Sequence, residues 1–256
     1  MSALTIHQFP CRTDNFGVLL HEASSGLTAS IDAPEAAAVR QALADKGWRL
    51  THILTTHHHA DHVEGNLELK TETGCTIVGP RGEAGKIPGI DSKVGGGETV
   101  RFGSCNAKVI DTPGHTLGHI SYWFETAKLA FVGDTLFSLG CGRILEGNPQ
   151  MMWNSLQRLM QLPPETSFHC GHEYSEANAR FAMTIEPGNP VLVARCAEIK
   201  SLRAAGKATL PASIGMELAA NPFLRPDSAE IRERLAMQDR ADWEVFAEIR
   251  ERKNKS

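Results

Sequence analysis

The chain has 256 residues, of which 41% are hydrophobic and 22% charged, and its formal net charge is -4. This composition is typical of a globular protein, and the acidic balance argues against the basic excess that a nucleic-acid-binding surface needs. No apolar run approaches the ~20 residues required for a membrane-spanning helix. A chain of this length can hold one large domain, or one of ordinary size followed by a smaller one.

The first part of the chain alternates strand-like runs with helical ones. Helices are predicted over 33–46 and over 63–70, with Gly47 and Gly74 as their glycine stops. The glycine-rich stretch 79–97 is predicted to be an irregular loop. Strands are predicted from short β-branched and apolar runs at 16–21, 27–32, 50–55, 75–78, 98–102, 107–111, 120–124, 129–132 and 166–170.

The pattern changes after Tyr174. An amphipathic helix is predicted at 151–162, but beyond Tyr174 no convincing strand remains. This change predicts an α/β (α+β) domain at residues 1–173 followed by a small all-helical domain at 174–256. The helices predicted in this second part cover 175–184, 190–205, 229–237 and 240–253.

The six cysteines are scattered along the chain and contain no C-x-x-C pair. Neither a disulfide framework nor a cysteine zinc site is indicated, so reduced thiols in the cytoplasm are expected. These residues are Cys11, Cys75, Cys105, Cys141, Cys170 and Cys196.

Four histidines and an aspartate follow the strand predicted at 50–55. Residues two apart in an extended chain point to the same side, so His57 and His59 can hold one cation together, and His58 points away from them. Asp61 and His62 fall where the chain turns into a helix, and they can reach a second point nearby. A polar loop that merely happens to be rich in histidine is the alternative, but five such residues at this density favour a metal site.

Three other loops that follow predicted strands offer further ligands. These are His115 after the tight turn Pro113-Gly114, Asp134 after Gly133, and His172 after Gly171. Each alone is more simply explained as a solvated turn residue. Four ligand-bearing loops at strand ends together favour a metal site at one edge of a sheet.

These residues resemble the metallo-β-lactamase superfamily, whose H-x-H-x-D-H signature corresponds to His57, His59, Asp61 and His62. The resemblance implies an αβ/βα sandwich with two divalent cations at one edge, zinc first and iron or manganese as alternatives. It implies that His57, His59 and His115 hold one metal, that Asp61, His62 and His172 hold the other, and that Asp134 bridges them. A metal-bridging hydroxide would then be the nucleophile of a hydrolase, with Asp61 and Asp134 as its catalytic carboxylates.

The chain is more narrowly similar to the glyoxalase II family, the hydroxyacylglutathione hydrolases. The matching motifs are Gly133-Asp134-Thr135-Leu136-Phe137, Gly140-Cys141-Gly142-Arg143, Cys170-Gly171-His172-Glu173-Tyr174 and Asn221-Pro222-Phe223-Leu224-Arg225. The resemblance implies hydrolysis of the thioester S-D-lactoylglutathione to D-lactate and glutathione, the second step of methylglyoxal detoxification.

The resemblance also implies a glutathione site made by Arg143, Tyr174, Arg250 and Lys253. An ordinary solvated pair on the last helix is the alternative for Arg250 and Lys253. The chain departs from some members at Leu145, where they have a tyrosine.

Several alternatives remain at this stage. A mononuclear iron glutathione persulfide dioxygenase of the same superfamily is the nearest rival, and a nuclease or a non-catalytic binding protein are more distant ones. The partner expected is a small-molecule glutathione thioester, with no nucleic acid, no membrane and a monomeric chain. Asp32 and Asp111 end strands and are candidates either to orient a ligating imidazole or simply to turn the chain.

Overall fold

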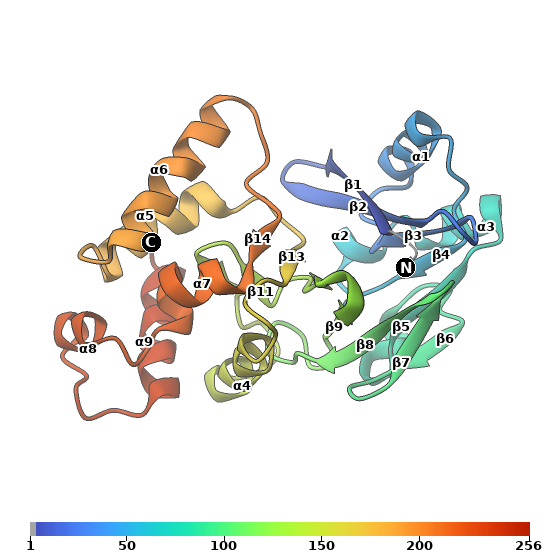
Figure 1. Cartoon of the computed structure of the whole chain (residues 1–256). Helices are drawn as coiled ribbons and strands as arrows, with labels where there is room; N and C mark the ends of the chain where they lie inside the picture. Colours follow the sequence, from blue (N-terminus) through green and yellow to red (C-terminus); the bar gives the residue numbers. More distant parts are fainter. Residues whose placement is uncertain (1–3) are drawn as a thin grey trace. The chain divides into compact units, whose positions relative to one another are not determined.

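The computed structural model describes residues 4–256 and divides into two compact units. The first unit consists of Met1–Asp111 and Thr116–Gly133, and the second of Thr112–His115 and Asp134–Ser256. The strands β1 to β10 belong to the first unit, and the helices α4 to α9 to the second (Figure 1).

One sheet of the first unit has six strands in sequence order. β1 pairs antiparallel with β2 and β2 with β3, whereas β3 to β6 pair parallel. The parallel pairing of β3 with β4 places their carboxyl ends side by side, and the Asp32 amide donates to the Leu54 carbonyl at 3.0 Å. The strands are β1 Leu4–Cys11, β2 Asn15–Glu22, β3 Leu27–Ile31, β4 His52–Leu54, β5 Thr76–Pro80 and β6 Ser92–Val94.

The other strands of the first unit are antiparallel, in the order β10-β9-β8-β7. They are β7 Thr99–Phe102, β8 Cys105–Asp111, β9 Ile120–Phe124 and β10 Leu129–Phe131, with a 3-10 turn at Glu125–Ala127. Apolar side chains that alternate along both sheets meet in one core, which makes the unit a β-sandwich. This core includes Leu20, Ile31, Leu54, Phe102, Val109 and Phe124.

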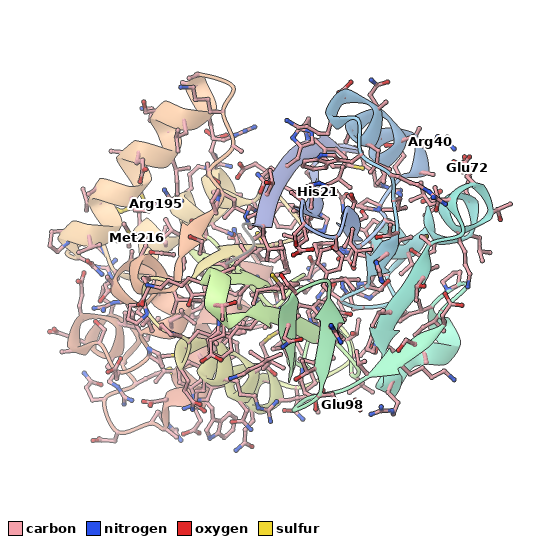
Figure 2. All side chains as sticks on the ribbon, turned by 45° about the vertical axis from the view of Figure 1, so that its right-hand side comes forward. His21, Arg40, Glu72, Glu98, Arg195 and Met216 are labelled. Atoms are coloured by element: carbon pink, nitrogen blue, oxygen red, sulfur yellow. The ribbon has the colours of Figure 1, made fainter. Side chains whose placement is uncertain are left out.

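Helices cover the outer face of the β1–β6 sheet. α1 (Ala36–Lys46) and α3 (Asn66–Thr73) belong to a second apolar core with the sheet, and Arg40 of α1 bonds to Glu68 and Glu72 of α3 (Figure 2). Both helices end at the predicted glycines, which have left-handed φ values of 65° and 70°. α1 begins three residues later than predicted, since Pro34 disfavours helical geometry at Ala33 and Glu35 has an extended backbone.

The structure of the first unit differs from the predictions in three places. Residues 79–97 are not wholly irregular, since they contain a 3-10 helix at Arg81–Lys86 and the strand β6. β1 was not predicted, and the helix predicted at 63–70 is split into α2 (Ala60–Val63) and α3. β1 and β6 lie at the edges of the sheet, where short or half-exposed strands lack a clear apolar pattern.

The second unit is mainly helical. Its helices are α4 Pro149–Met160, α5 Ser175–Ile185, α6 Pro190–Ala204, α7 Ile214–Ala220, α8 Ala229–Leu235 and α9 Asp242–Asn254, with a 3-10 turn at Pro222–Leu224. Asn148 and Asn189 cap α4 and α6 with their side chains, and a proline follows each at the first helical position. Figure 1 shows α5 beside α6, and a small apolar core joins them.

Four short strands complete the second unit. β11 (Leu136–Phe137) and β12 (Gly140–Cys141) form a hairpin, and β13 (Ser167–His169) pairs antiparallel with β14 (Ala212–Ser213). The expectation that no strand follows Tyr174 was therefore wrong, as was the omission of α7. Both elements are too short to produce a periodic signal. Within residues 4–256, no helix is both long and apolar enough to cross a membrane.

Candidate metal centre

The histidine-rich loop lies in the first unit, directly after β4. The Nε2 atom of His57 lies 3.1 Å from Nδ1 of His59, so two imidazoles converge as their i, i+2 spacing predicts. His62 is buried, and its Nε2 lies 3.8 Å from a carboxylate oxygen of Asp61. The rings of His57 and His62 are 4.0 Å apart between centroids. The loop thus gathers four potential ligands around one place.

Asp32, which directly follows β3, orients this loop. Its Oδ2 atom lies 2.8 Å from His62 Nδ1, and the Thr56 amide and hydroxyl donate to its two oxygens at 2.6 and 2.8 Å. One atom each of Asp32, His57 and His62 lies within 4.8 Å of the others. A carboxylate bonded to Nδ1 fixes the tautomer in which Nε2 can ligate a metal. Of the two roles considered for Asp32, the structure supports the orienting one.

Asp111 has a different environment. Its side chain is exposed, and Oδ1 accepts a hydrogen bond from the Gly96 amide at 2.7 Å. This bond holds the loop at Gly96 to the end of β8.

His115, Asp134 and His172 come together within the second unit. Asp134 Oδ2 lies 3.5 Å from Nε2 of His115 and 3.3 Å from Nε2 of His172, so the carboxylate stands between two imidazoles. His115 Nδ1 is held at 2.7 Å from the Arg143 carbonyl. Gly142 is required here, because a Cβ atom on it would lie 1.9 Å from the Asp134 carbonyl oxygen.

The donor chemistry of both groups fits a metal. Imidazole nitrogens and carboxylate oxygens suit zinc, iron and manganese alike. All seven side chains are buried or partly buried, and each unit directs nitrogen and oxygen atoms toward a shared point. These His/Asp groups are consistent with metal binding.

Glu83 is a residue of this region that sequence reasoning missed. It is buried, and its two carboxylate oxygens accept from the amides of His58 at 2.7 Å and Gly118 at 2.9 Å. The Nδ1 atom of His58 lies 3.1 Å from a carboxylate oxygen of Glu83, and its ring lies edge-on to that of His59, with centroids 5.0 Å apart. Because Glu83 lies in a glycine-rich stretch with no motif around it, nothing in the sequence marks it. The ring of His119 stacks on that of His57, with centroids 4.8 Å apart.

Two of the predicted substrate residues adjoin the ligands of the second unit. The Tyr174 ring stacks on the His172 ring, with centroids 4.7 Å apart and planes 2° apart. Arg143 has an exposed side chain, while its carbonyl holds His115. Leu145, the position of the family departure, is 55% exposed.

The other two predicted substrate residues are less exposed than a solvated pair would be. Arg250 is only 8% exposed; its Nη1 donates to the Cys141 carbonyl at 2.8 Å, and its guanidinium lies over Phe223. Lys253 is partly buried and donates to the Ala177 carbonyl at 3.1 Å. Burial, together with the charges of Arg250 and Arg180, lowers the pKa of the Lys253 amino group.

None of the six cysteines is in a disulfide, as predicted. Burial raises the pKa of the Cys141 thiol to about 11 and that of Cys170 well above its ordinary value. A thiol that stays protonated at neutral pH is a poor nucleophile, so this environment does not favour cysteine catalysis.

Two family models together match most of the chain. Residues 25–172 match the metallo-beta-lactamase superfamily, and residues 173–256 match the hydroxyacylglutathione hydrolase C-terminus. A protein of Brucella anthropi named hydroxyacylglutathione hydrolase is 58% identical over 251 residues, covering 98% of this chain and 96% of that protein. One of the same name from Methylococcus capsulatus is 55% identical and covers 98% of both.

Solved structures with the same fold are more distant in sequence. ETHE1 from Myxococcus xanthus is 27% identical with a TM-score of 0.70, covering 96% of this chain and 90% of that one. The B3 metallo-beta-lactamase BLEG-1 is 19% identical with a TM-score of 0.67, covering 86% of this chain and 100% of that one, which shows a common fold alone.

Proposed function

This chain belongs to the hydroxyacylglutathione hydrolase family of the metallo-β-lactamase superfamily, and we propose from this that it hydrolyses 2-hydroxyacylglutathione thioesters, S-D-lactoylglutathione first among them. The products are the 2-hydroxy acid and glutathione. The observation that carries the proposal is full-length similarity combined with two groups of converging His/Asp side chains. The C-terminal family match also favours this activity over a persulfide dioxygenase.

The proposal takes its ligand sets from the superfamily signature. His57, His59 and His115 would hold one divalent cation, and Asp61, His62 and His172 a second, with Asp134 shared. When bound, two such cations supply a hydroxide at neutral pH and polarise a carbonyl. The position of Asp134, with one oxygen near both His115 and His172, supports the shared role.

The ligands are held in place by their neighbours. Asp32 orients His62, the Arg143 carbonyl orients His115, and Tyr174 stacks on His172. Such contacts keep the metal-binding nitrogens aimed before any ion arrives, which reduces the cost of ordering them.

Recognition of glutathione falls to a group of cations and one aromatic ring. Glutathione is an anionic peptide, and its carboxylates need local positive charge. Lys253 lies among Arg250 and Arg180 with a lowered pKa, so a bound carboxylate would relieve the repulsion among these like charges. We assign Arg143, Tyr174, Arg250 and Lys253 to this role.

The leaving group requires little help from the protein. Attack of water on the thioester carbonyl forms a C–O bond, and collapse of the tetrahedral intermediate breaks the C–S bond. The departing thiolate has a conjugate acid of pKa ~8.5, so no general acid is needed near it.

The test is a metal count combined with an assay of S-D-lactoylglutathione turnover on protein purified without added metal. We expect two divalent ions per chain, zinc or iron or manganese, and release of D-lactate and glutathione in equal amounts. A single iron, with oxygen uptake on glutathione persulfide and no thioester hydrolysis, would establish the dioxygenase instead. The same preparation tests the expectation of a monomer by its sedimentation, and cell fractionation tests the expected cytoplasmic location.

A further inference from the structure

The hairpin β11–β12 connects two of the functional residues, since Asp134 precedes it and Arg143 follows it. Its turn residue Leu139 has a φ of 56°, in the left-handed region that leucine rarely adopts. A backbone in that region persists only where its surroundings hold it. In the second unit, buried polar side chains hold this turn in place.

Glu217 of α7 supports the turn directly. Its side chain is fully buried, and Oε2 accepts from the Leu139 amide at 2.8 Å and from Asn221 Nδ2 at 2.9 Å. Burial raises the pKa of this carboxyl to about 7. Burying a carboxyl is costly unless it forms hydrogen bonds, so a buried glutamate aimed at one backbone amide indicates a specific positional role.

Asn221 supports the two strands of the hairpin. It is fully buried, and besides Glu217 its Nδ2 contacts the carbonyls of Phe137 at 3.3 Å and Gly140 at 3.0 Å. It is the first residue of the motif Asn221-Pro222-Phe223-Leu224-Arg225, to which neither metal nor substrate binding assigns a role.

Three further side chains from the helices complete the support. Asn178 donates to the Ser138 carbonyl at 3.2 Å, and Arg195 of α6 (Figure 2) donates to the Ser138 hydroxyl at 3.2 Å. Arg250 reaches the Cys141 carbonyl. Every residue from Phe137 to Cys141 therefore bonds to a polar side chain of the helical region.

We propose that Glu217 and Asn221 are positioning residues for the reaction, which hold the β11–β12 hairpin so that Asp134 and Arg143 at its two ends keep their working positions. The inference rests on the proposed function. Asp134 and Arg143 directly adjoin the two ends of the hairpin, and the Gly142 amide bonds to the Thr135 carbonyl at 3.1 Å. A shift of the hairpin would therefore move both residues. The helical region then supports the metal ligand Asp134 as well as the substrate.

The experiment compares Asn221→Ala, Glu217→Ala and Glu217→Gln with the unchanged full-length protein. Three quantities are measured: zinc affinity by chelator competition, and kcat and KM on S-D-lactoylglutathione. The matched control is Asn189→Ala, because Asn189 is also a buried asparagine, bonded to Glu186 and to the Ala219 carbonyl of α7 but not to the hairpin.

We expect both alanine variants to bind zinc about tenfold or more weakly and to lose kcat by a similar factor. Glu217→Gln should stay within about twofold, since its amide oxygen can accept the same two hydrogen bonds. Asn189→Ala should lower Tm without changing zinc affinity or kcat. A failure to hydrolyse any glutathione thioester would refute only the proposed function. The zinc affinities of the variants would still decide whether Glu217 and Asn221 position Asp134.

Three results would overturn the inference. In the first, folded Asn221→Ala and Glu217→Ala proteins bind zinc as the unchanged protein does. In the second, Asn189→Ala weakens zinc binding as much as they do. In the third, Glu217→Gln is as impaired as Glu217→Ala, which would remove the argument from hydrogen bonds. If Asn221→Ala does not fold, the Glu217 pair decides the question.

Discussion

Asp32 illustrates how much depends on a single side chain. It lies directly after the end of β3, with a φ of 56°. Its Oδ1 accepts from the Thr56 amide, and its Oδ2 accepts from His62 Nδ1 and from the Thr56 hydroxyl. No oxygen of this carboxylate can become an NH₂ group without facing another donor. These hydrogen bonds hold the Asp32 carboxylate in one orientation, and the carboxylate in turn holds the His62 ring.

We predict that Asp32→Asn weakens metal binding about 10- to 100-fold. The NH₂ group of the asparagine would face the N–H group of His62 or that of Thr56, and the His62 ring would lose its fixed orientation. Competition with a chromogenic chelator measures the change. Asp111→Asn is the matched control, since Asp111 also ends a strand but bonds to the amide of Gly96. Equal affinity of Asp32→Asn and the unchanged protein would contradict an orienting role.

Lys253 is a better probe of glutathione recognition than Arg250. Arg250 is buried against the hairpin carbonyl of Cys141, so its removal would disturb structure and binding together. Lys253 is partly buried and donates to the Ala177 carbonyl of α5 at 3.1 Å, so its removal disturbs less of the fold.

We predict that Lys253→Ala raises KM for S-D-lactoylglutathione about tenfold, the value of one charged hydrogen bond, and leaves kcat nearly unchanged. A short thioester without glutathione should be hydrolysed as before. Lys255→Ala serves as control, because Lys255 is exposed and pairs with Glu251 on the same helix. An equal loss on both thioesters would mean that Lys253 does not bind the peptide.

At the scale of elements, the motif that begins with Asn221 also holds the end of α5. Arg225, at its end, forms two bonds with Glu186, at 2.9 and 3.0 Å, and Glu186 ends α5. Burial acts to raise the pKa of Glu186, but hydrogen bonds from Arg225, Asn189 and Ser228 outweigh it, and the pKa is lowered from 4.5. The ionised form therefore stabilises the fold.

We predict that Glu186→Gln lowers the free energy of unfolding by about 1.5 to 3 kcal/mol at pH 7. A carboxyl whose pKa is lower in the folded state contributes stability above its unfolded value, and this contribution is lost as the pH falls through the folded value. The difference between the two proteins should therefore narrow below pH 4.5. Urea unfolding at several pH values measures it, and a difference independent of pH would contradict the account.

At the scale of the whole molecule, the proposed ligands are spread over the chain from His57 to His172. They lie in four loops, each of which follows a strand or a strand-like segment. Within each unit the fold brings together side chains that are distant in the sequence, and a metal bound by the proposed ligands would stabilise the folded state in return.

We predict that removal of metal with a chelator lowers Tm. The free energy of unfolding should fall by about 4 kcal/mol relative to protein with free metal at a thousand times its dissociation constant. Calorimetry before and after zinc is restored measures the change. Asp134→Asn should show a smaller difference between its metal-free and metal-loaded forms. An unchanged Tm on verified metal removal would contradict a ligand set that spans the fold.

Much of the fold could be predicted because local patterns are properties of the chain itself. The glycines at 47 and 74 end helices whatever the rest of the fold, and the alternation along 107–111 marks a strand with one buried face. The edge strands β1 and β6 were not predicted, because a half-exposed edge strand does not need apolar residues at every second position.

By itself, the sequence determined the kinds of candidate metal ligand and their local spacing, which is why the convergence of His57 with His59 could be predicted. Only the tertiary structure decided that Asp32 meets His62, that Glu83 holds the His58 amide, and that Glu217 and Asn221 hold the hairpin after Asp134. The physical reason is that these hydrogen bonds join residues 25 or more positions apart. Such contacts exist only after strands and helices have packed, and no local pattern records them.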